Sequence, residues 1–286
     1  MLFSHSCSWL WYGACSPVPM LTLMTKLDEG VCAMSIRNRL IAISDLHGNL
    51  PALEAVLADV VSRGQPDLWW VLGDLAAFCP WPTETIARLR ALPNAAFLQG
   101  NTDRYLVTGQ RPQIVIHSEE DWDNLRGWIA ERDANFRWTL DHLTYADYAF
   151  LRELPPRLRI EVPGYGAVAA VHATAHDDET FMPPDTPDEQ LAAAFDTIDA
   201  RLILCGHTHR PMDRTVNGVR IVNDGSVGMP LDGDPRPTYV QLDFDGPDCQ
   251  VTIHRVDYDR QAVIAELERV QHPARSWVIQ RLKTAR

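Results

Sequence analysis

The sequence predicts an α/β fold in which two β-sheets pack together and helices cover their outer faces. In the first third of the chain, short apolar runs of strand length alternate with segments of helical periodicity, which is typical of a mainly parallel, buried sheet. Strand runs joined by turns dominate the second half, which looks antiparallel. A hydrophobic content of 46% over 286 residues is enough for a large core.

Three strands in the first third each end in polar residues. The expected elements are, in chain order, strand 40–43, helix 50–62, strand 68–72, helix 83–92 and strand 95–98. The strands are followed by Ser44-Asp45-Leu46-His47-Gly48-Asn49, by Gly73-Asp74 and by Gly100-Asn101-Thr102-Asp103. Ligands of parallel sheets bind outside the carboxyl ends of the strands, so these loops hold candidate site residues.

The strand signal disappears over residues 118–154, which we interpret as a helical excursion beside the site. Ser118 precedes three acidic residues and is placed as an N-cap, and a second helix is expected near Thr144, with Asp147 positioned as in a capping box. The segment also carries an aromatic stripe, namely Trp122, Trp128 and Trp138. Because such stripes are usually buried, we expect these rings to pack in the core rather than line a pocket.

Past residue 156 the strand signal returns. The expected elements are a hairpin of strands 158–162 and 167–171, a helix that opens at Thr186-Pro187-Asp188-Glu189 and runs through Phe195, strands 202–205, 219–222, 239–244 and 250–256, and a final helix over 261–270. Two of these strands again end in polar residues, at His172 and at Gly206-His207-Thr208-His209. The polar strand ends of both halves can therefore belong to one site.

The charge and cysteine content exclude several classes of protein. A formal net charge of −12 argues against sequence-independent binding to nucleic acid or to an anionic membrane, because such contacts need clustered basic groups. The apolar runs are much shorter than a bilayer span. The six cysteines form no C-x-x-C pair, so we expect reduced thiols and a cytoplasmic protein.

The first 33 residues differ from the rest of the chain. They show little periodicity, and no Lys or Arg precedes their apolar patch at residues 9–12, which fits a secretory signal poorly. We expect a disordered or non-native extension, such as one from an unused upstream start codon, rather than a targeting segment. Residues 34–286 are expected to form one domain.

Seven polar strand-end residues are of the types that bind divalent metal ions. They are Asp45, His47, Asp74, Asn101, His172, His207 and His209. Carboxylates and imidazoles suit a divalent transition metal, and an Asn amide supplies a neutral oxygen. Seven ligands are too many for one ion but suit two ions roughly 3.5–4 Å apart, which clamp the attacking and leaving oxygens of a phosphoryl displacement. One carboxylate must then bridge the ions, and Asp74 is the natural candidate.

Each fragment alone also has an ordinary structural interpretation. Gly73-Asp74 and Gly100-Asn101 are typical of turns. His172 alone fits a hydrogen-bonded histidine at a strand end. The His207-Thr208-His209 run is a stronger signal, because two nearby imidazoles after a buried strand are uncommon outside metal sites. The combination of all fragments at strand ends favours a metal site.

In this order the motifs resemble those of the calcineurin-like metallophosphoesterases. The matching residues are Asp45-Leu46-His47-Gly48-Asn49, Gly73-Asp74, Gly100-Asn101-Thr102-Asp103, Val171-His172 and Gly206-His207-Thr208-His209. The runs at 43–59, 71–75 and 223–228 resemble the bacterial and archaeal cytosolic phosphodiesterase branch. The resemblance covers residues 38–260, nearly everything except the amino-terminal segment.

The resemblance implies a four-layer α/β/β/α sandwich of two packed mixed sheets flanked by helices, with a helical insertion and two metal sites. One ion would be held by Asp45, His47, Asp74 and His209, and the other by Asp74, Asn101, His172 and His207. A hydroxide bridging the ions would attack phosphorus directly, with no covalent intermediate. The candidate catalytic residues are Asp74, Asn101, Asp103 and His172.

The chain departs from the family pattern at two positions. Thr102 stands where the family usually has a histidine that helps the leaving group, and Asp224 stands where a proline is usual. Thr102 is a candidate substrate contact, as are Arg104, which could orient a phosphate beside Asp103, and His176 in a polar loop. The alternatives are a surface charge for Arg104 and a solvated histidine for His176.

We predict a cytoplasmic, dinuclear metal-dependent phosphoesterase that acts on a small phosphoester, with phosphodiesters favoured. The ligand types do not separate Mn²⁺, Fe²⁺ and Zn²⁺. Phosphomonoesterase and dinucleoside polyphosphatase activities are the enzymatic alternatives. The non-enzymatic alternative is a scaffold that keeps the fold but binds proteins, and the presence of all seven ligands argues against it.

Overall fold

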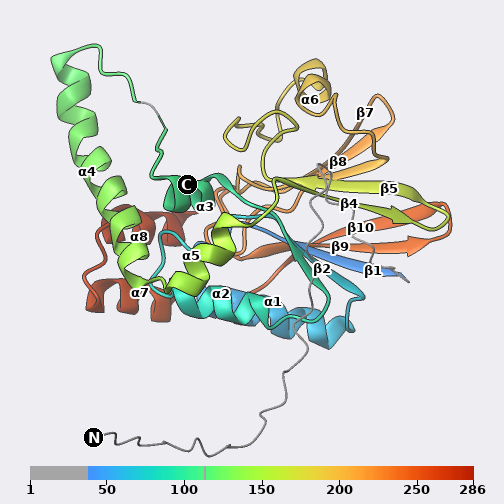
Figure 1. Ribbon diagram of the computed structural model, residues 1–286, viewed down its shortest axis with the longest axis horizontal. Coiled ribbons are helices and arrows are strands. Elements are labelled where there is room, and N and C mark those ends of the chain that lie inside the picture. Colours follow the sequence, from blue (N-terminus) through green and yellow to red (C-terminus); the bar gives the residue numbers. More distant parts are fainter. Residues whose placement is uncertain (1–37, 113) are drawn as a thin grey trace, which may run out of the picture.

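The computed structural model describes residues 38–112 and 114–286, which form two five-stranded sheets packed together with helices on both outer faces (Figure 1). The extension expected over residues 1–33 lies outside the described residues. Within the described part, Cys79, Cys205 and Cys249 are free thiols. No helix in these two ranges has both the length and the apolar character needed to cross a membrane.

The first sheet has the strand order β10-β9-β1-β2-β3. Its strands are β1 (Arg39–Ile43), β2 (Leu68–Val71), β3 (Ala95–Phe97), β9 (Thr238–Asp245) and β10 (Asp248–Arg255). Parallel pairing joins β1 to β2 and β2 to β3, and the connecting helices are α1 (Leu50–Arg63) and α2 (Pro82–Arg90). The βα units predicted from the first third are therefore confirmed, and β9 and β10 extend the sheet in antiparallel fashion.

The second sheet has the order β4-β5-β6-β8-β7. Its strands are β4 (Arg157–Val162), β5 (Gly166–Val171), β6 (Leu202–Cys205), β7 (Met212–Val216) and β8 (Val219–Asn223). The expectation of an antiparallel second half is wrong for its centre, because β5 pairs with β6 and β6 with β8 in parallel. The chain between β5 and β6, which includes α6 (Asp188–Ala194), supplies the crossover that parallel neighbours require.

Buried apolar side chains hold the layers together. Between the two sheets, Leu40 and Trp70 of the first sheet pack in one cluster with Leu204 of the second, and all three are almost fully buried. Burial of one such large side chain contributes about 1.5–3 kcal/mol. Separate clusters lie between the first sheet and α1 and between the second sheet and α6. Figure 1 shows α1 and α2 along one outer face and α6 on the other, so the four-layer arrangement is confirmed.

The helical excursion consists of α4 (Glu119–His142) and α5 (Tyr145–Arg152). As predicted, the Ser118 side chain caps α4, and Thr144 forms a capping box with Asp147 at the start of α5. The interpretation of the tryptophans as core residues is wrong for two of them, since Trp122 is 52% exposed and Trp128 is 41% exposed. Helix α4 extends away from the sheets in Figure 1, so part of its surface has no sheet to cover.

Three helices complete the described chain. The one over residues 260–269 was expected, and the other two were not. The three helices are α3 (Asn101–Thr108), α7 (Arg260–Arg269) and α8 (Arg275–Thr284). Helix α3 begins inside the polar run after β3, where the residues also suit a turn. Helix α8 has few apolar residues, and only Val278, Ile279 and Leu282 are buried. Such a short amphipathic helix gives a weak periodic signal.

Candidate metal centre

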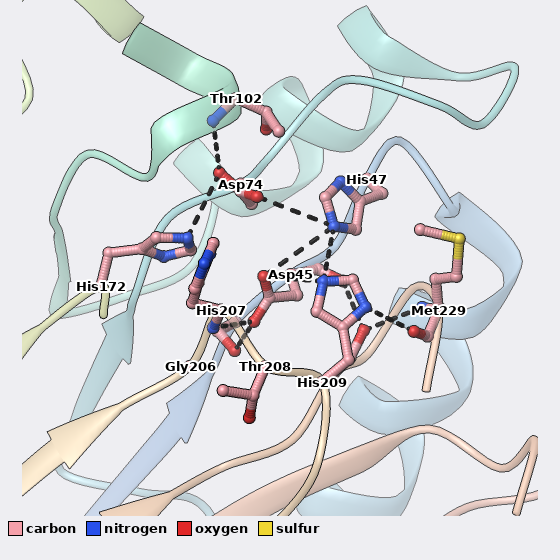
Figure 2. A network of polar contacts seen from close by, with 12 residues as sticks. Asp45, His47, Asp74, Thr102, His172, Gly206, His207, Thr208, His209 and Met229 are labelled. Atoms are coloured by element: carbon pink, nitrogen blue, oxygen red, sulfur yellow. Dashed lines mark hydrogen bonds and ion pairs between the residues drawn. The ribbon is translucent and has the colours of Figure 1, made fainter. Parts of the chain in front are cut away.

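The structure brings all seven predicted ligands together at the carboxyl ends of strands from both sheets. Asp45 and His47 follow β1, Asp74 follows β2, Asn101 begins α3, His172 follows β5, and His207 and His209 follow β6. Figure 2 shows Asp74 between His47 and His172, with Asp45 and His209 beside them. Each loop is short and follows directly on a strand of one of the sheets, so the sheets fix the positions of the side chains.

The first group of converging atoms belongs to Asp45, His47 and His209. Their candidate ligand atoms all lie within 4.8 Å of one another. The Nε2 atoms of His47 and His209 are 3.1 Å apart, and His209 Nε2 is 3.2 Å from Asp45 Oδ1. This Asp45 oxygen is buried and has no hydrogen-bond partner in the described part of the chain. A cation is the ligand that satisfies such a cluster of acceptors.

The second group surrounds the other side of Asp74. The Asn101 amide oxygen lies 3.0 Å from His172 Nε2 and 3.1 Å from His207 Nδ1. Asp74 Oδ1 lies 3.6 Å from His172 Nε2, whereas Asp74 Oδ2 lies 3.8 Å from His47 Nε2. The two oxygens of Asp74 therefore face different ligand groups, as a bridging carboxylate must.

Backbone carbonyls orient three of the four imidazoles. His172 Nδ1 is 2.7 Å from Leu72 O, His209 Nδ1 is 2.6 Å from Met229 O, and His207 Nε2 is 2.9 Å from Glu179 O. A carbonyl oxygen can only accept a hydrogen bond, so each of these ring nitrogens carries a hydrogen and donates it to the carbonyl. The opposite nitrogen then carries a lone pair that faces the other ligands. This is how metal-binding histidines are held in proteins.

The electrostatic environment favours neutral imidazoles at His47 and His207 beside an ionised Asp45. For His172, burial acts to lower the pKa, but the carboxylates of Asp74 and Asp45 raise it above its ordinary value. Burial, with a contribution from His172, lowers the pKa of His207 to about 4. Burial also lowers the pKa of His47 well below its ordinary value. For Asp45, burial acts to raise the pKa, but His209 and the other imidazoles hold it below the usual range. A cation can therefore bind without first displacing protons from His47, His207 or Asp45 at neutral pH.

Five of the seven candidate ligands have a left-handed backbone conformation. The φ angles are 52° at Asp45, 50° at His47, 58° at Asp74, 65° at His207 and 56° at His209. Such conformations cost non-glycine residues on the order of 1–3 kcal/mol each and persist where the surrounding structure enforces them. The strain is thus concentrated where the side chains must converge.

Two glycines allow the loops to approach each other closely. A Cβ atom at Gly100 would lie 2.2 Å from Asp74 Oδ1, and one at Gly206 would lie 2.7 Å from Asp45 Oδ2. These separations are too short for any side chain. The glycines of both motifs are therefore needed to keep the two carboxylates in place.

Asp103 lies behind the site and positions it. Its carboxylate accepts backbone N–H groups of Asp74 at 2.8 Å, Leu75 at 3.0 Å and Gly100 at 3.0 Å. It ties the end of β2 to the start of α3, and it does not line the cavity described below. These contacts place the Asp103 carboxylate where it holds the backbone around Asp74, and the catalytic role expected for Asp103 stays a prediction.

Sequence reasoning missed a buried chain of polar groups behind Asp45. Ser44 Oγ lies 2.5 Å from both Asp45 Oδ2 and Asp224 Oδ1. Burial raises the pKa of Asp224 well above its ordinary value, which favours the protonated carboxyl. One hydroxyl hydrogen cannot serve two acceptors, and a protonated Asp224 leaves the Ser44 hydroxyl free to donate to Asp45. The departure from proline at position 224, noted in the sequence, is the only signal that pointed there.

The three expected substrate contacts lie in different places. Thr102 lines the cavity, and its buried hydroxyl has no hydrogen-bond partner among the described residues. Arg104 forms a two-pronged ion pair with Asp178, with both N–O distances 2.7 Å, and also pairs with Glu179. His176 Nε2 lies 3.1 Å from Ala193 O. Arg104 and His176 do not line the cavity beside the candidate ligands, and their roles as substrate contacts stay predictions.

A cavity of about 270 Å³ opens beside the candidate ligands. His47, Asp74, Asn101, His207 and His209 form its polar side. Side chains from α4 and α8, among them Trp128 and Trp277, form an aromatic wall. Trp128 belongs to the aromatic stripe that we expected in the core rather than in a pocket, and this expectation is wrong for Trp128. Trp277 lies far away in the chain, in a segment where no helix was expected.

Comparison with known proteins also indicates a metal-dependent phosphoesterase. The family described as the calcineurin-like phosphoesterase superfamily domain matches residues 39–246. The uncharacterized protein MJ0912 of Methanocaldococcus jannaschii is 29% identical over 264 residues, which are 86% of this chain and 98% of the relative. A metallophosphoesterase from Sphaerobacter thermophilus has 26% identity and a TM-score of 0.68, with coverage of 87% and 99%. Hypothetical protein PH1004 from Pyrococcus horikoshii OT3, at 19% identity and a TM-score of 0.72, has the same fold over 87% and 98% of the two chains.

Proposed function

Because this chain belongs to the calcineurin-like phosphoesterase superfamily, we propose that it is a two-metal phosphodiesterase that hydrolyses a P–O bond of a small substrate. The observation that carries the proposal is the position of Asp74, whose two oxygens face separate groups of ligands at 3.6 and 3.8 Å. A single-metal or purely structural site has no need of a carboxylate shared in this way.

The residues present suit two divalent ions of the transition series, for which Mn²⁺, Fe²⁺ and Zn²⁺ are the candidates. Asp45, His47, Asp74 and His209 would hold one ion, and Asp74, Asn101, His172 and His207 the other. When bound, such ions supply a water of lowered pKa and neutralise charge on phosphate oxygens. The chain itself orients the imidazoles through backbone carbonyls and keeps Asp45 ionised.

Attack of water-derived hydroxide on phosphorus, without a covalent intermediate, agrees with the side chains that line the cavity. Thr102 lies beside Asp74, and its buried hydroxyl has no hydrogen-bond partner among the described residues. A threonine becomes a nucleophile only when a neighbouring base activates it. The apolar and aromatic walls suit a phosphorus atom that carries two organic groups, which favours a diester over a monoester.

The proposal predicts a preference that a substrate panel can measure. With Mn²⁺-loaded protein, bis(4-nitrophenyl) phosphate should be hydrolysed with a kcat/KM at least about tenfold above that of 4-nitrophenyl phosphate, because the second aryl group contacts the apolar wall. A dinucleoside tetraphosphate completes the panel. A preference for the monoester or the tetraphosphate would replace the diester assignment, and hydrolysis of none of them would favour the scaffold alternative.

We also propose that the protein acts in the cytoplasm. Cys79 and Cys205 are buried free thiols, and Cys249 is a partly exposed one. Proteins of oxidising compartments commonly pair such cysteines, whereas the cytosol keeps them reduced.

A further inference from the structure

The wall of the cavity beside the metal centre is unusually rich in large rings. Six aromatic side chains line it, namely Phe78, Tyr105, Trp128, Phe136, Phe181 and Trp277. Phe181 is 51% exposed and Trp128 is 41% exposed, although both are large and apolar. Exposed rings around a concave site mark a surface that a ligand covers.

Contacts between rings keep the inner part of this wall rigid. Phe78 packs edge to face against Trp277 with ring centroids 5.0 Å apart, and against Phe136 with centroids 5.7 Å apart. Phe78 also lies 5.0 Å from the His47 ring, centroid to centroid. The aromatic wall is therefore continuous with the candidate metal ligands, and a planar group bound on it would lie close to them.

Arg281 of α8 also lines the cavity, and it has no anionic partner among the described residues. Its guanidinium lies 4.7 Å from the centroid of the Trp277 ring, and no hydrogen bond or ion pair of its side chain occurs within residues 38–112 and 114–286. The other arginine of the cavity, Arg132, is paired, since its Nε lies 2.9 Å from Asp133. Burial lowers the pKa of Arg281, which reflects the loss of water around it.

A partly buried arginine without an anionic partner among the described residues is notable in a chain that has 38 acidic and 26 basic residues. A partly buried guanidinium loses hydration, and this loss is offset only when an anion accepts its N–H groups. The planar fork of arginine matches a phosphate in particular. The cation–π contact with Trp277 orients the group but leaves its donors unused.

We propose that Arg281 binds a second phosphate of the substrate, and that the substrate is a nucleotide phosphodiester whose base lies against the aromatic wall. This inference rests on the proposed function, because it places the reacting phosphate at the candidate metal ligands. A volume of about 270 Å³ suits one base and its phosphates rather than two complete nucleosides. Aromatic side chains bind bases by stacking, whatever the identity of the base.

The test compares two substrates that differ only in the second phosphate. Both are 4-nitrophenyl esters of thymidine 5′-phosphate, one with a free 3′-hydroxyl and one with a 3′-phosphate, so the bond cleaved is the same. For the Mn²⁺-loaded protein we expect KM to be about 10- to 100-fold lower for the 3′-phosphorylated ester, which is the usual strength of a charge-assisted contact. The kcat values should stay within about threefold of each other.

Variants then assign the effect to Arg281. Arg281→Gln should reduce the KM ratio of the two esters to near one, and Arg281→Lys should retain part of it, because the charge remains but the fork is lost. Lys283→Gln removes an exposed charge from the same helix and should keep the wild-type ratio. A ratio of two KM values does not depend on the fraction of folded enzyme, so a destabilised variant remains informative.

The outcomes separate this inference from the proposed function. Hydrolysis of both esters by the wild type with equal KM would overturn the second-phosphate site and leave the phosphodiesterase intact. A lower KM that persists in Arg281→Gln would overturn the assignment to Arg281. Hydrolysis of neither ester, when bis(4-nitrophenyl) phosphate is cleaved, would exclude nucleotides as substrates. Hydrolysis of none of the three would overturn the proposed function as well.

Discussion

Replacement of Asp74 by asparagine should lower kcat/KM for bis(4-nitrophenyl) phosphate by at least about 10³-fold, the upper end of what the loss of one preorganised electrostatic contact costs. Asparagine keeps the size of the side chain but removes its charge and turns one oxygen into an amide nitrogen that cannot bind a cation. Because the two Asp74 oxygens face His47 and His172 separately, this single change weakens both ligand groups. The measurement is steady-state kinetics together with the metal content of the purified variant.

The matched control for this variant is Asp141→Asn. Asp141 lies on α4, its side chain is 68% exposed, and its pair with Arg137 is 3.9 Å long. Exposed pairs of this kind contribute little to stability, so both activity and metal content should remain those of the wild type. If Asp74→Asn keeps two ions and most of its activity while it melts like the wild type, Asp74 does not bridge the site.

The second large effect concerns the group that leaves phosphorus. A histidine near the leaving oxygen can donate a proton as the bond breaks, and such general-acid help is worth about 10²–10⁴-fold. The chain has Thr102 at the matching position, and its unpartnered hydroxyl in the cavity stays protonated at neutral pH. Rates should therefore depend steeply on leaving-group acidity, with aryl diesters cleaved readily and alkyl diesters slowly.

A series of substituted phenyl diesters measures this dependence directly. Thr102→His should flatten the slope of log kcat/KM against leaving-group pKa and accelerate mainly the poor leaving groups. Thr102→Val, which keeps the shape but removes the hydroxyl, should leave the slope steep. A flat slope in the wild type, with the chemical step shown to be rate-limiting, would mean that another group supplies the proton.

The sequence was sufficient to predict that the seven candidate ligands come together, because the information is local. Strand runs end at Asp45 and Asp74, and the carboxyl ends of neighbouring parallel strands meet at one edge of a sheet. The same rule covers His172 and His207, whose strands β5 and β6 also pair in parallel. The antiparallel assignment of that half failed because the crossover through α6 is long and its strands are short.

The aromatic cavity could not be predicted, because it depends on how distant segments pack. Trp128 lies on α4 and Trp277 on α8, and their meeting is set by tertiary contacts rather than by spacing in the sequence. In the sequence, nothing distinguishes Arg281 from the other basic residues near it, Arg275 and Lys283. The left-handed backbone at five of the candidate ligands could not be predicted either, because the residue types Asp and His do not by themselves indicate a positive φ.

The most direct test of the account is a titration of metal-free protein with Mn²⁺ in which bound metal and hydrolysis of bis(4-nitrophenyl) phosphate are followed together. The two-metal arrangement predicts binding of about two ions per chain, with activity that rises mainly as the second ion binds. Saturation at one ion with full activity, or two bound ions without hydrolysis of this diester or of the nucleotide esters, would contradict it.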